Sequence, residues 1–114
     1  MDKLNPKIAP WVHFLRAHGF NTCDSGDGET HDYACDRDYA YVSIRVAPTL
    51  LSTTADRLLA ILQGRGYTVE AVGLATKGEA EIEASYDPVN QIGIIDLRWP
   101  HGLPETPPAK EARR

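Results

Sequence analysis

Positive charge, cysteine and long apolar runs are all scarce in this 114-residue chain, whose formal net charge is -4. Its 16 Asp and Glu residues outnumber 12 Lys and Arg residues, and the arginines are scattered singly instead of forming a basic groove. Such a chain is a poor ligand for duplex nucleic acid. No apolar run reaches the roughly 18 residues of a membrane span, and the first residues lack the order of a signal peptide. We therefore expect a soluble, cytoplasmic protein that does not bind membranes.

The length and composition are typical of one modest globular domain. Hydrophobic residues make up 42% of the chain and charged residues 25%, as in ordinary folded proteins. Folding at this length removes roughly 65% of the unfolded chain's surface from water, which allows a core without metal or disulfide. From Pro100 onward, four prolines and few large apolar side chains leave little to bury. We predict a single domain over residues 1–99 and a disordered, Pro-rich tail over residues 100–114.

The two cysteines, Cys23 and Cys35, flank an acidic stretch. Reductants in a cytoplasm keep such thiols free. Their separation also allows a disulfide loop, or a zinc site completed by His31. However, the sequence lacks the paired Cys-x-x-Cys or His-x-x-x-His units typical of zinc sites. We therefore expect two free thiols and no cofactor.

Two segments have the apolar spacing of helices that pack on a sheet. The first follows Pro10, which is tolerated at a helix start, and Gly19 is placed to end it. Ser52 and Thr53 can cap the second helix, and Gly64 can end it. The predicted apolar faces consist of Ile8, Trp11, Val12 and Leu15 in the first helix and Ala55, Leu58, Leu59 and Leu62 in the second.

Four segments have the alternation of strands, at residues 39–46, 67–74, 79–86 and 91–99, and turn residues 87–90 join the last two as a hairpin. Helices separated from a mainly antiparallel sheet indicate an α+β fold. We predict two layers, with a sheet of about four strands and both helices on one face. The side chains expected to face the core are Ala40, Val42, Ile44 and Val46 in the first strand and Ala80, Ile82, Ala84 and Tyr86 in the third.

A polar segment between the first helix and the first strand concentrates side chains capable of chemistry. Three interpretations of it remain open. In a simple turn, Asp24 and Asp27 bond downstream amides while Gly26 and Gly28 adopt positive φ. A cation site would use the carboxylates, although the spacing fails the EF-hand pattern. A phosphate or carboxylate nest would use successive amides of residues 25–28. The candidate binding residues of this segment are Asp24, Ser25, Asp27, Glu29, His31 and Asp32.

The predicted exposed face of strand 39–46 is a second candidate surface. It presents Tyr39, Tyr41 and Arg45, and such side chains carry much of the energy of molecular recognition. The alternative is that a second subunit or the first helix covers this face.

A catalytic arrangement of His31 and Asp32 with a cysteine nucleophile is conceivable, yet nearness in sequence does not make a triad. We therefore predict no catalytic residues.

Several stretches of the chain resemble small uncharacterised accessory proteins of tailed bacteriophages and prophages. The most particular is Asp-Ser-Gly-Asp-Gly at residues 24–28, within the longer match 15–28. Further matching stretches lie at 42–46, 55–58 and 84–88. The resemblance implies a setting in a host cell's cytoplasm, where small phage proteins without enzyme motifs often block a defence component or sequester its nucleotide signal.

These observations lead to a binding protein without enzymatic activity as the first hypothesis. An acidic surface could compete for the basic groove of a defence complex that is guided by or cuts nucleic acid. Alternatively, a homo-oligomer could enclose a nucleotide between Tyr39, Tyr41 and Arg45. Two other classes remain open. One is a virion or assembly protein, and the other is a metal-dependent phosphoester hydrolase that uses Asp24, Asp27, Glu29 and His31.

Overall fold

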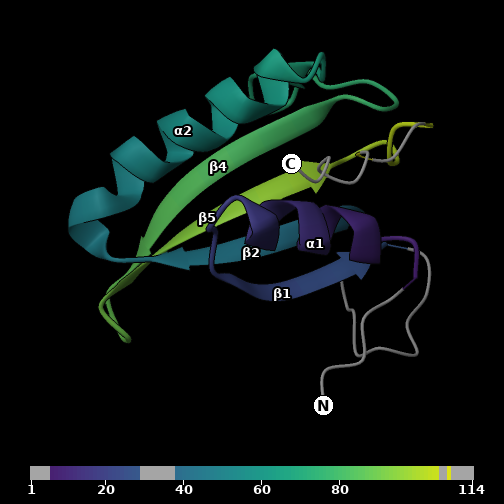
Figure 1. Ribbon diagram of the computed structural model, residues 1–114. Helices are drawn as coiled ribbons and strands as arrows, with labels where there is room; N and C mark the ends of the chain where they lie inside the picture. Colours follow the sequence, from purple (N-terminus) through teal and green to yellow (C-terminus); the bar gives the residue numbers. More distant parts are fainter. Residues whose placement is uncertain (1–5, 29–37, 106–107, 109–114) are drawn as a thin grey trace.

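The computed structural model describes residues 6–28, 38–105 and 108. Within these ranges, two helices and five strands follow one another (Figure 1). Their bounds are α1 Ala9–Ala17, β1 Thr22–Asp27, β2 Ala40–Val46, α2 Leu51–Gly64, β3 Val69–Glu70, β4 Ala80–Asp87 and β5 Ile92–Trp99, with a 3-10 turn Pro48–Leu50 before α2.

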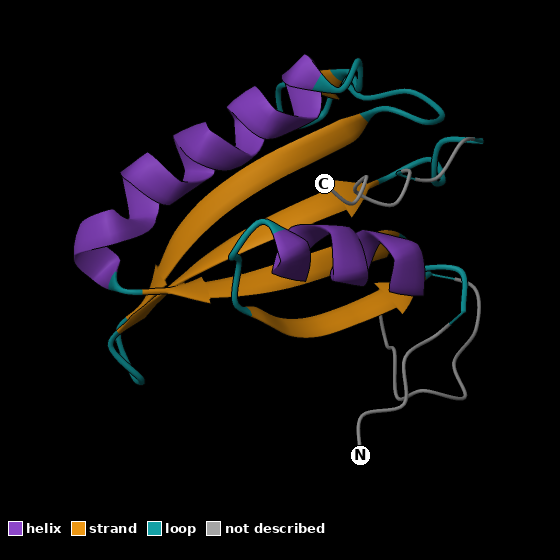
Figure 2. Ribbon diagram, in the orientation of Figure 1, coloured by secondary structure: helices purple, strands orange, loops and turns teal. Residues whose placement is uncertain are grey.

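The α+β fold is confirmed, with both helices on one face of a mostly antiparallel sheet (Figure 2). The strand order is β1-β2-β5-β4-β3, and among the described residues only β3 pairs in parallel, with β4. The sheet has five strands instead of about four because the acidic segment, predicted to be an irregular loop that could include a short strand, forms β1. Of the predicted strand 67–74, only residues 69–70 form a strand, which is β3, and residues 72–74 form a turn.

Both helices form where the apolar spacing predicts them. In α1 the predicted residues Trp11, Val12 and Leu15 are buried, together with Phe14. In α2 the buried residues are Leu58 and Leu62. No helix in the described ranges is long and apolar enough to cross a membrane.

The prediction that Ser52 and Thr53 cap α2 is wrong. The N-cap is Leu50, which makes no side-chain capping bond. Pro48 starts a 3-10 turn that leads directly into the helix, so both polar residues lie inside its first turn. A fixed φ at proline favours such an early start.

The core lies between the helices and the alternating residues of β2 and β5. Paired residues on this side include Ala40 with Trp99, Val42 with Leu97 and Ile44 with Ile95. Each is 2% exposed or less. The full buried cluster contains Ile8, Trp11, Val12, Phe14, Leu15, Phe20, Ala40, Val42, Ile44, Leu58, Leu62, Ala80, Ile95, Leu97 and Trp99.

The domain extends past the predicted boundary at residue 99. Leu103 packs against the core, and the carbonyl of Gly102 accepts a hydrogen bond from the Gly78 amide at 3.1 Å. Residues 100–105 therefore belong to the fold, and that part of the predicted tail is corrected. An apolar side chain placed soon after β5 reaches the core although its neighbours are prolines and polar residues.

The predicted faces of β4 are correct along its length, but the predicted burial of its inward side chains is wrong near its end. Ala80 is buried, but Ala84 is exposed and Tyr86 is 52% exposed. Leu51, the first residue of α2, lies against Gly93 of β5, the residue that pairs with Tyr86.

The end of β1 depends on a glycine in two ways. Gly28 has φ 77°, and a Cβ there would lie 2.5 Å from the carbonyl carbon of Tyr39. The predicted positive φ of Gly28 is confirmed, whereas Gly26 has no positive φ. Gly66 also has a positive φ but has open space around it.

We expect Gly28→Ala to lower the free energy of unfolding by about 2 kcal/mol, because it adds a backbone clash to the strain of positive φ. Gly66→Ala is the matched control and should cost about 1 kcal/mol, from strain alone. Urea unfolding of both variants measures the difference. Equal losses would contradict the close approach of Gly28 and Tyr39.

Candidate functional site

The acidic segment is the edge strand β1, not a loop. It pairs with β2 in an antiparallel register that sets Ser25 opposite Val42 and Asp27 opposite Ala40. A bulge between Thr22 and Asp24 adjusts the pairing near its start. An extended backbone does not form the concave nest of amides expected for phosphate binding, so that interpretation is not supported.

The two carboxylates of β1 lie on opposite faces of the sheet. Asp24 is opposite Ser43, on the face away from the helices, whereas Asp27 is opposite the core residue Ala40. Side chains alternate along a strand, so positions three residues apart face opposite ways. Asp24 is exposed and Asp27 is 4% exposed. The two cannot share a cation, which argues against the interpretation of this segment as a cation site.

Other predicted residues of this segment fall outside the described part of the chain, namely Glu29, His31, Asp32 and Cys35. Among the described residues, no group of three or more His, Cys, Asp or Glu side chains is arranged to hold a metal ion. No protein-family model, curated protein or solved structure matches this chain.

Tyr41 is not the exposed aromatic that the strand pattern predicts. It is 2% exposed, and its hydroxyl donates a hydrogen bond to Asp24 Oδ2 at 2.9 Å. The ring of the half-buried Tyr39 meets it edge-on, with centroids 6.2 Å apart. Tyr41 therefore cannot stack on a base. Its role is to hold the carboxylate of Asp24 in place.

The face of the sheet away from the helices carries a row of polar side chains across four strands. Cross-strand pairing places Asp24 of β1 beside Ser43 of β2, then Asp96 of β5, then Glu83 of β4. We call these four residues the acidic row. Ser43 donates from its hydroxyl to Asp96 Oδ1. Three strand spacings of roughly 4.8 Å give the row a length of about 14 Å.

Arg98 joins two glutamates next to this row. Its Nε donates to Glu81 Oε1 at 3.1 Å and its Nη1 donates to Glu83 Oε1 at 2.7 Å. Glu83 and Asp96 are directly opposed, an arrangement that like charges normally disfavour. The hydrogen bonds from Arg98 and Ser43 offset that repulsion. The row is thus fixed in position before any partner binds.

Glu81 was expected to face water and is instead 3% exposed. Its Oε2 accepts the amides of Gly73 at 2.9 Å and Ala75 at 3.4 Å, which draws the β3–β4 connection onto the sheet. Burial alone would raise the pKa of Glu81, but the Gly73 amide, the Arg98 guanidinium and the Ala75 amide together lower it. Burial alone would lower the pKa of Arg98, yet Glu83 and Glu81 raise it.

The stability of the fold should therefore fall in acid partly through Glu81. A pKa below that of the unfolded chain means that the carboxylate contributes stability above the ordinary glutamate range. That contribution disappears as the pH falls through the folded pKa. Between about pH 7 and pH 3, urea unfolding should show a smaller loss of unfolding free energy in Glu81→Gln than in the native chain. Identical pH profiles would contradict this assignment.

Cys23 is a free thiol beside the acidic row. Its Sγ lies 3.6 Å from the Ser43 carbonyl oxygen, to which it donates. Partial burial raises the pKa of Cys23, the charge of Arg45 opposes the rise, and Asp24 and Asp96 add to it. A thiol that stays protonated at neutral pH is a poor nucleophile. The geometry gives no support to the catalytic arrangement with Cys23.

Arg45 is exposed on the same face of the sheet as the acidic row, two residues along β2 from Ser43. Ser25 lies on the helix side of β1 and is half-buried, with its amide bonded to Asp24 Oδ1 at 2.9 Å. Among the predicted residues, the structure thus brings Asp24 and Tyr41 into contact and places Arg45 on the same face of the sheet. Sequence reasoning missed four further residues of this face, namely Asp96, Glu81, Glu83 and Arg98. The available signal was the alternation of charged side chains in two strands that form a hairpin.

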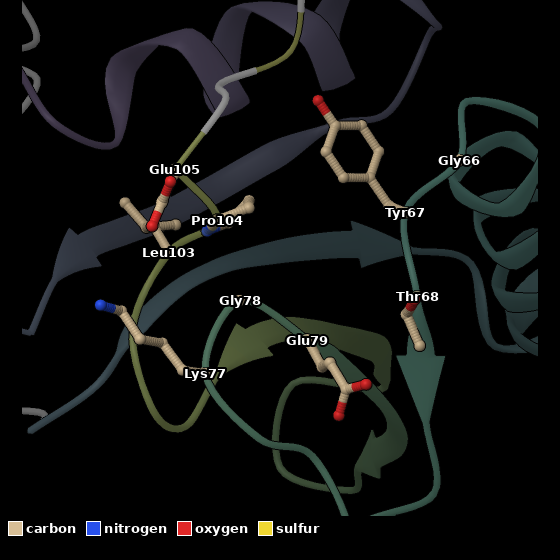
Figure 3. A pocket seen from close by; sticks show the side chains of 9 residues that line it. All are labelled: Gly66, Tyr67, Thr68, Lys77, Gly78, Glu79, Leu103, Pro104 and Glu105. Carbon is tan, nitrogen blue, oxygen red and sulfur yellow. The ribbon is translucent and has the colours of Figure 1, made fainter.

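A separate cleft of about 380 Å³ lies near the end of α2. It is bounded by the α2–β3 connection, the β3–β4 connection and the segment after β5, with Tyr67 and Lys77 on opposite sides (Figure 3). The Thr76 amide and then its hydroxyl lower the pKa of Glu79, which accepts both at 2.8 Å. None of the predicted site residues lines this cleft. The lining consists of Gly66, Tyr67, Thr68, Lys77, Gly78, Glu79, Leu103, Pro104 and Glu105.

Proposed function

We propose that this chain is a non-enzymatic accessory protein, of the phage-like kind, that binds and blocks a host defence component. The binding surface is the face of the sheet away from the helices, centred on the acidic row. The partner is a protein with a basic groove that normally holds nucleic acid. The observation that carries this proposal is the fixed line of carboxylates Asp24, Asp96 and Glu83.

Charge supports a basic partner. In the described chain two arginines, Arg45 and Arg98, share this face with five carboxylates, of which Glu81 is buried. The five are Asp24, Glu81, Glu83, Asp87 and Asp96. The carboxylates at the ends of the row are accessible, because Asp24 is exposed and the Glu83 side chain is 51% exposed. Complementary potentials of this kind favour fast association and suppress wrong partners.

Preorganisation also supports binding. Tyr41 holds Asp24 at 2.9 Å, and Arg98 holds Glu83 at 2.7 Å. Side chains that are already ordered lose less conformational entropy when a partner binds. A partner's lysines and arginines would therefore meet carboxylates whose spacing is set by the sheet, much as they meet phosphates along a nucleic acid.

Sequestration of a nucleotide signal receives less support. That version needs two accessible tyrosines as a stacking platform, and Tyr41 is 2% exposed with its hydroxyl on Asp24. The carboxylates of the acidic row would also repel a nucleotide's phosphates. We therefore propose a protein partner in preference to a small anionic ligand.

The test combines two measurements on the full chain. Immobilised protein should retain a nucleic-acid-guided or nucleic-acid-cutting defence complex from host lysate, and calorimetry with cyclic and linear nucleotides should show no heat of binding. The double variant Asp24→Asn, Glu83→Gln keeps one acceptor oxygen at each position but removes two charges, and should weaken the complex about tenfold.

The matched control is the double variant Asp56→Asn, Glu105→Gln, which removes the same charge from exposed positions elsewhere. It should bind as the native chain does. Nucleotide binding in the calorimeter, or equal weakening by the two double variants, would contradict the proposal.

A further inference from the structure

The β3–β4 connection holds two large apolar side chains in solvent. Val72 is 56% exposed and Leu74 is 65% exposed, whereas the adjacent Ala75 is 5% exposed. Single exposed aliphatic residues are common on protein surfaces and need no explanation. These two lie two positions apart on a segment whose backbone is anchored to the sheet. We call Val72 and Leu74 the apolar pair.

The anchor of this segment is the buried carboxylate of Glu81. Its Oε2 accepts the amides of Gly73 at 2.9 Å and Ala75 at 3.4 Å, on either side of Leu74 in the chain. The Leu74 amide itself donates to the Ala71 carbonyl at 3.0 Å, and Gly73 has φ 92°, which glycine adopts at little cost. The apolar pair is therefore carried by an ordered backbone, which has little conformational entropy left to lose when a partner binds.

The anchored segment adjoins the acidic row. Glu81 lies on the face of the sheet away from the helices, two residues before Glu83 in β4, and Arg98 donates to both glutamates, at 3.1 Å and 2.7 Å. The amides that Glu81 accepts therefore lie beside the Glu83 end of the row. Figure 2 shows the β3–β4 connection at one end of β4 and the β4–β5 turn at the other. Fixed carboxylates and a fixed pair of aliphatic residues are thus neighbours on one part of the surface.

We propose that the apolar pair belongs to the same binding surface as the acidic row and enters an apolar pocket beside the basic groove of the partner protein. This inference rests on the proposed function and adds a second feature to its partner. The acidic row orients the complex and speeds its formation, whereas the apolar pair adds affinity when its side chains leave water. Protein interfaces generally combine an apolar region with polar and charged groups around it.

Charge and side-chain chemistry argue for this occupant. A nucleic acid or a nucleotide would bring phosphates toward the acidic row, and aliphatic side chains do not stack on bases as aromatic ones do. A two-fold contact with a second copy would set the same patch against itself, which brings two acidic rows close together. A protein with basic and apolar groups side by side meets both features without such repulsion.

Equilibrium binding at two salt concentrations tests the proposal, with the full chain and the defence complex that the immobilised native chain retains from host lysate. Val72→Ala, Leu74→Ala should weaken the complex about tenfold, and equally at about 0.1 M and about 0.5 M salt, because salt does not screen apolar contacts. The loss caused by Asp24→Asn, Glu83→Gln should shrink at the higher concentration. Both members of the apolar pair are exposed, so urea unfolding of their double variant should match that of the native chain.

The matched control is Leu50→Ala, Val89→Ala, which truncates two aliphatic side chains that are 53% and 86% exposed outside the β3–β4 connection. It should bind as the native chain does at both salt concentrations. Equal weakening by the two aliphatic double variants, no effect of Val72→Ala, Leu74→Ala, or a loss that shrinks with salt would overturn this inference. Weakening by Asp24→Asn, Glu83→Gln would in each of those cases still support the acidic row. A native chain that retains no defence complex would overturn both proposals.

Discussion

Replacement of Glu81 by alanine should lower the free energy of unfolding by about 3 kcal/mol, the largest effect expected from any charged residue described. The carboxylate is 3% exposed and accepts from Arg98 and from the amides of Gly73 and Ala75. Its removal leaves those amides without this acceptor and leaves Arg98, only 15% exposed, with one glutamate. Urea unfolding at neutral pH measures the loss.

Glu83→Ala is the matched control for Glu81. It contacts the same guanidinium at 2.7 Å, but its side chain is 51% exposed. An accessible ion pair contributes under about 1 kcal/mol, so this variant should be much closer to the native chain. Equal losses in the two variants would show that burial and the two amides add nothing to the role of Glu81.

Trp99→Ala should cost about 4 kcal/mol of unfolding free energy, because it leaves a large cavity in the core. Trp99 is 1% exposed, and its ring centroid lies 4.6 Å from that of Trp11. It is also the last residue of β5, where the chain turns toward Leu103. The loss should appear in urea unfolding and as a change in the fluorescence of the remaining Trp11.

Leu74→Ala is the surface comparison for Trp99. Leu74 is 65% exposed, and its truncation should change the unfolding free energy by no more than about 0.5 kcal/mol. If Trp99→Ala proved as mild as this, the pairing of the two tryptophans at the centre of the core would be contradicted.

Periodicity predicted the elements whose apolar residues face one core. The helices around Trp11 and Leu58, the strand Ala40–Val46 and the hairpin of β4 and β5 were all predicted near their observed bounds. The sequence did not predict β1, because an edge strand of Asp, Ser and Gly lacks the apolar alternation that marks a strand. Its pairing with β2 is long-range, and it places Gly26 and Asp27 in buried positions.

The candidate site was only partly predictable for a related reason. The alternation in strand 39–46 gave the correct face for Tyr41, but not its burial, since the Asp24 carboxylate that receives its hydroxyl lies on another strand. Likewise, Glu81 was assigned to solvent because local pattern cannot show that the β3–β4 connection folds back onto it. Asp96 became part of the site only through the register of β2 with β5.

The most direct test of the central claim, that the acidic row is the binding surface, is the plating efficiency of a phage on a defended bacterial host. The host should carry a nucleic-acid-guided or nucleic-acid-cutting defence system and express either the native chain, the Asp24→Asn, Glu83→Gln variant or the Asp56→Asn, Glu105→Gln control at equal levels. The account predicts that the native chain and the control restore plating, while the acidic-row variant does not. Restoration by all three chains would contradict it.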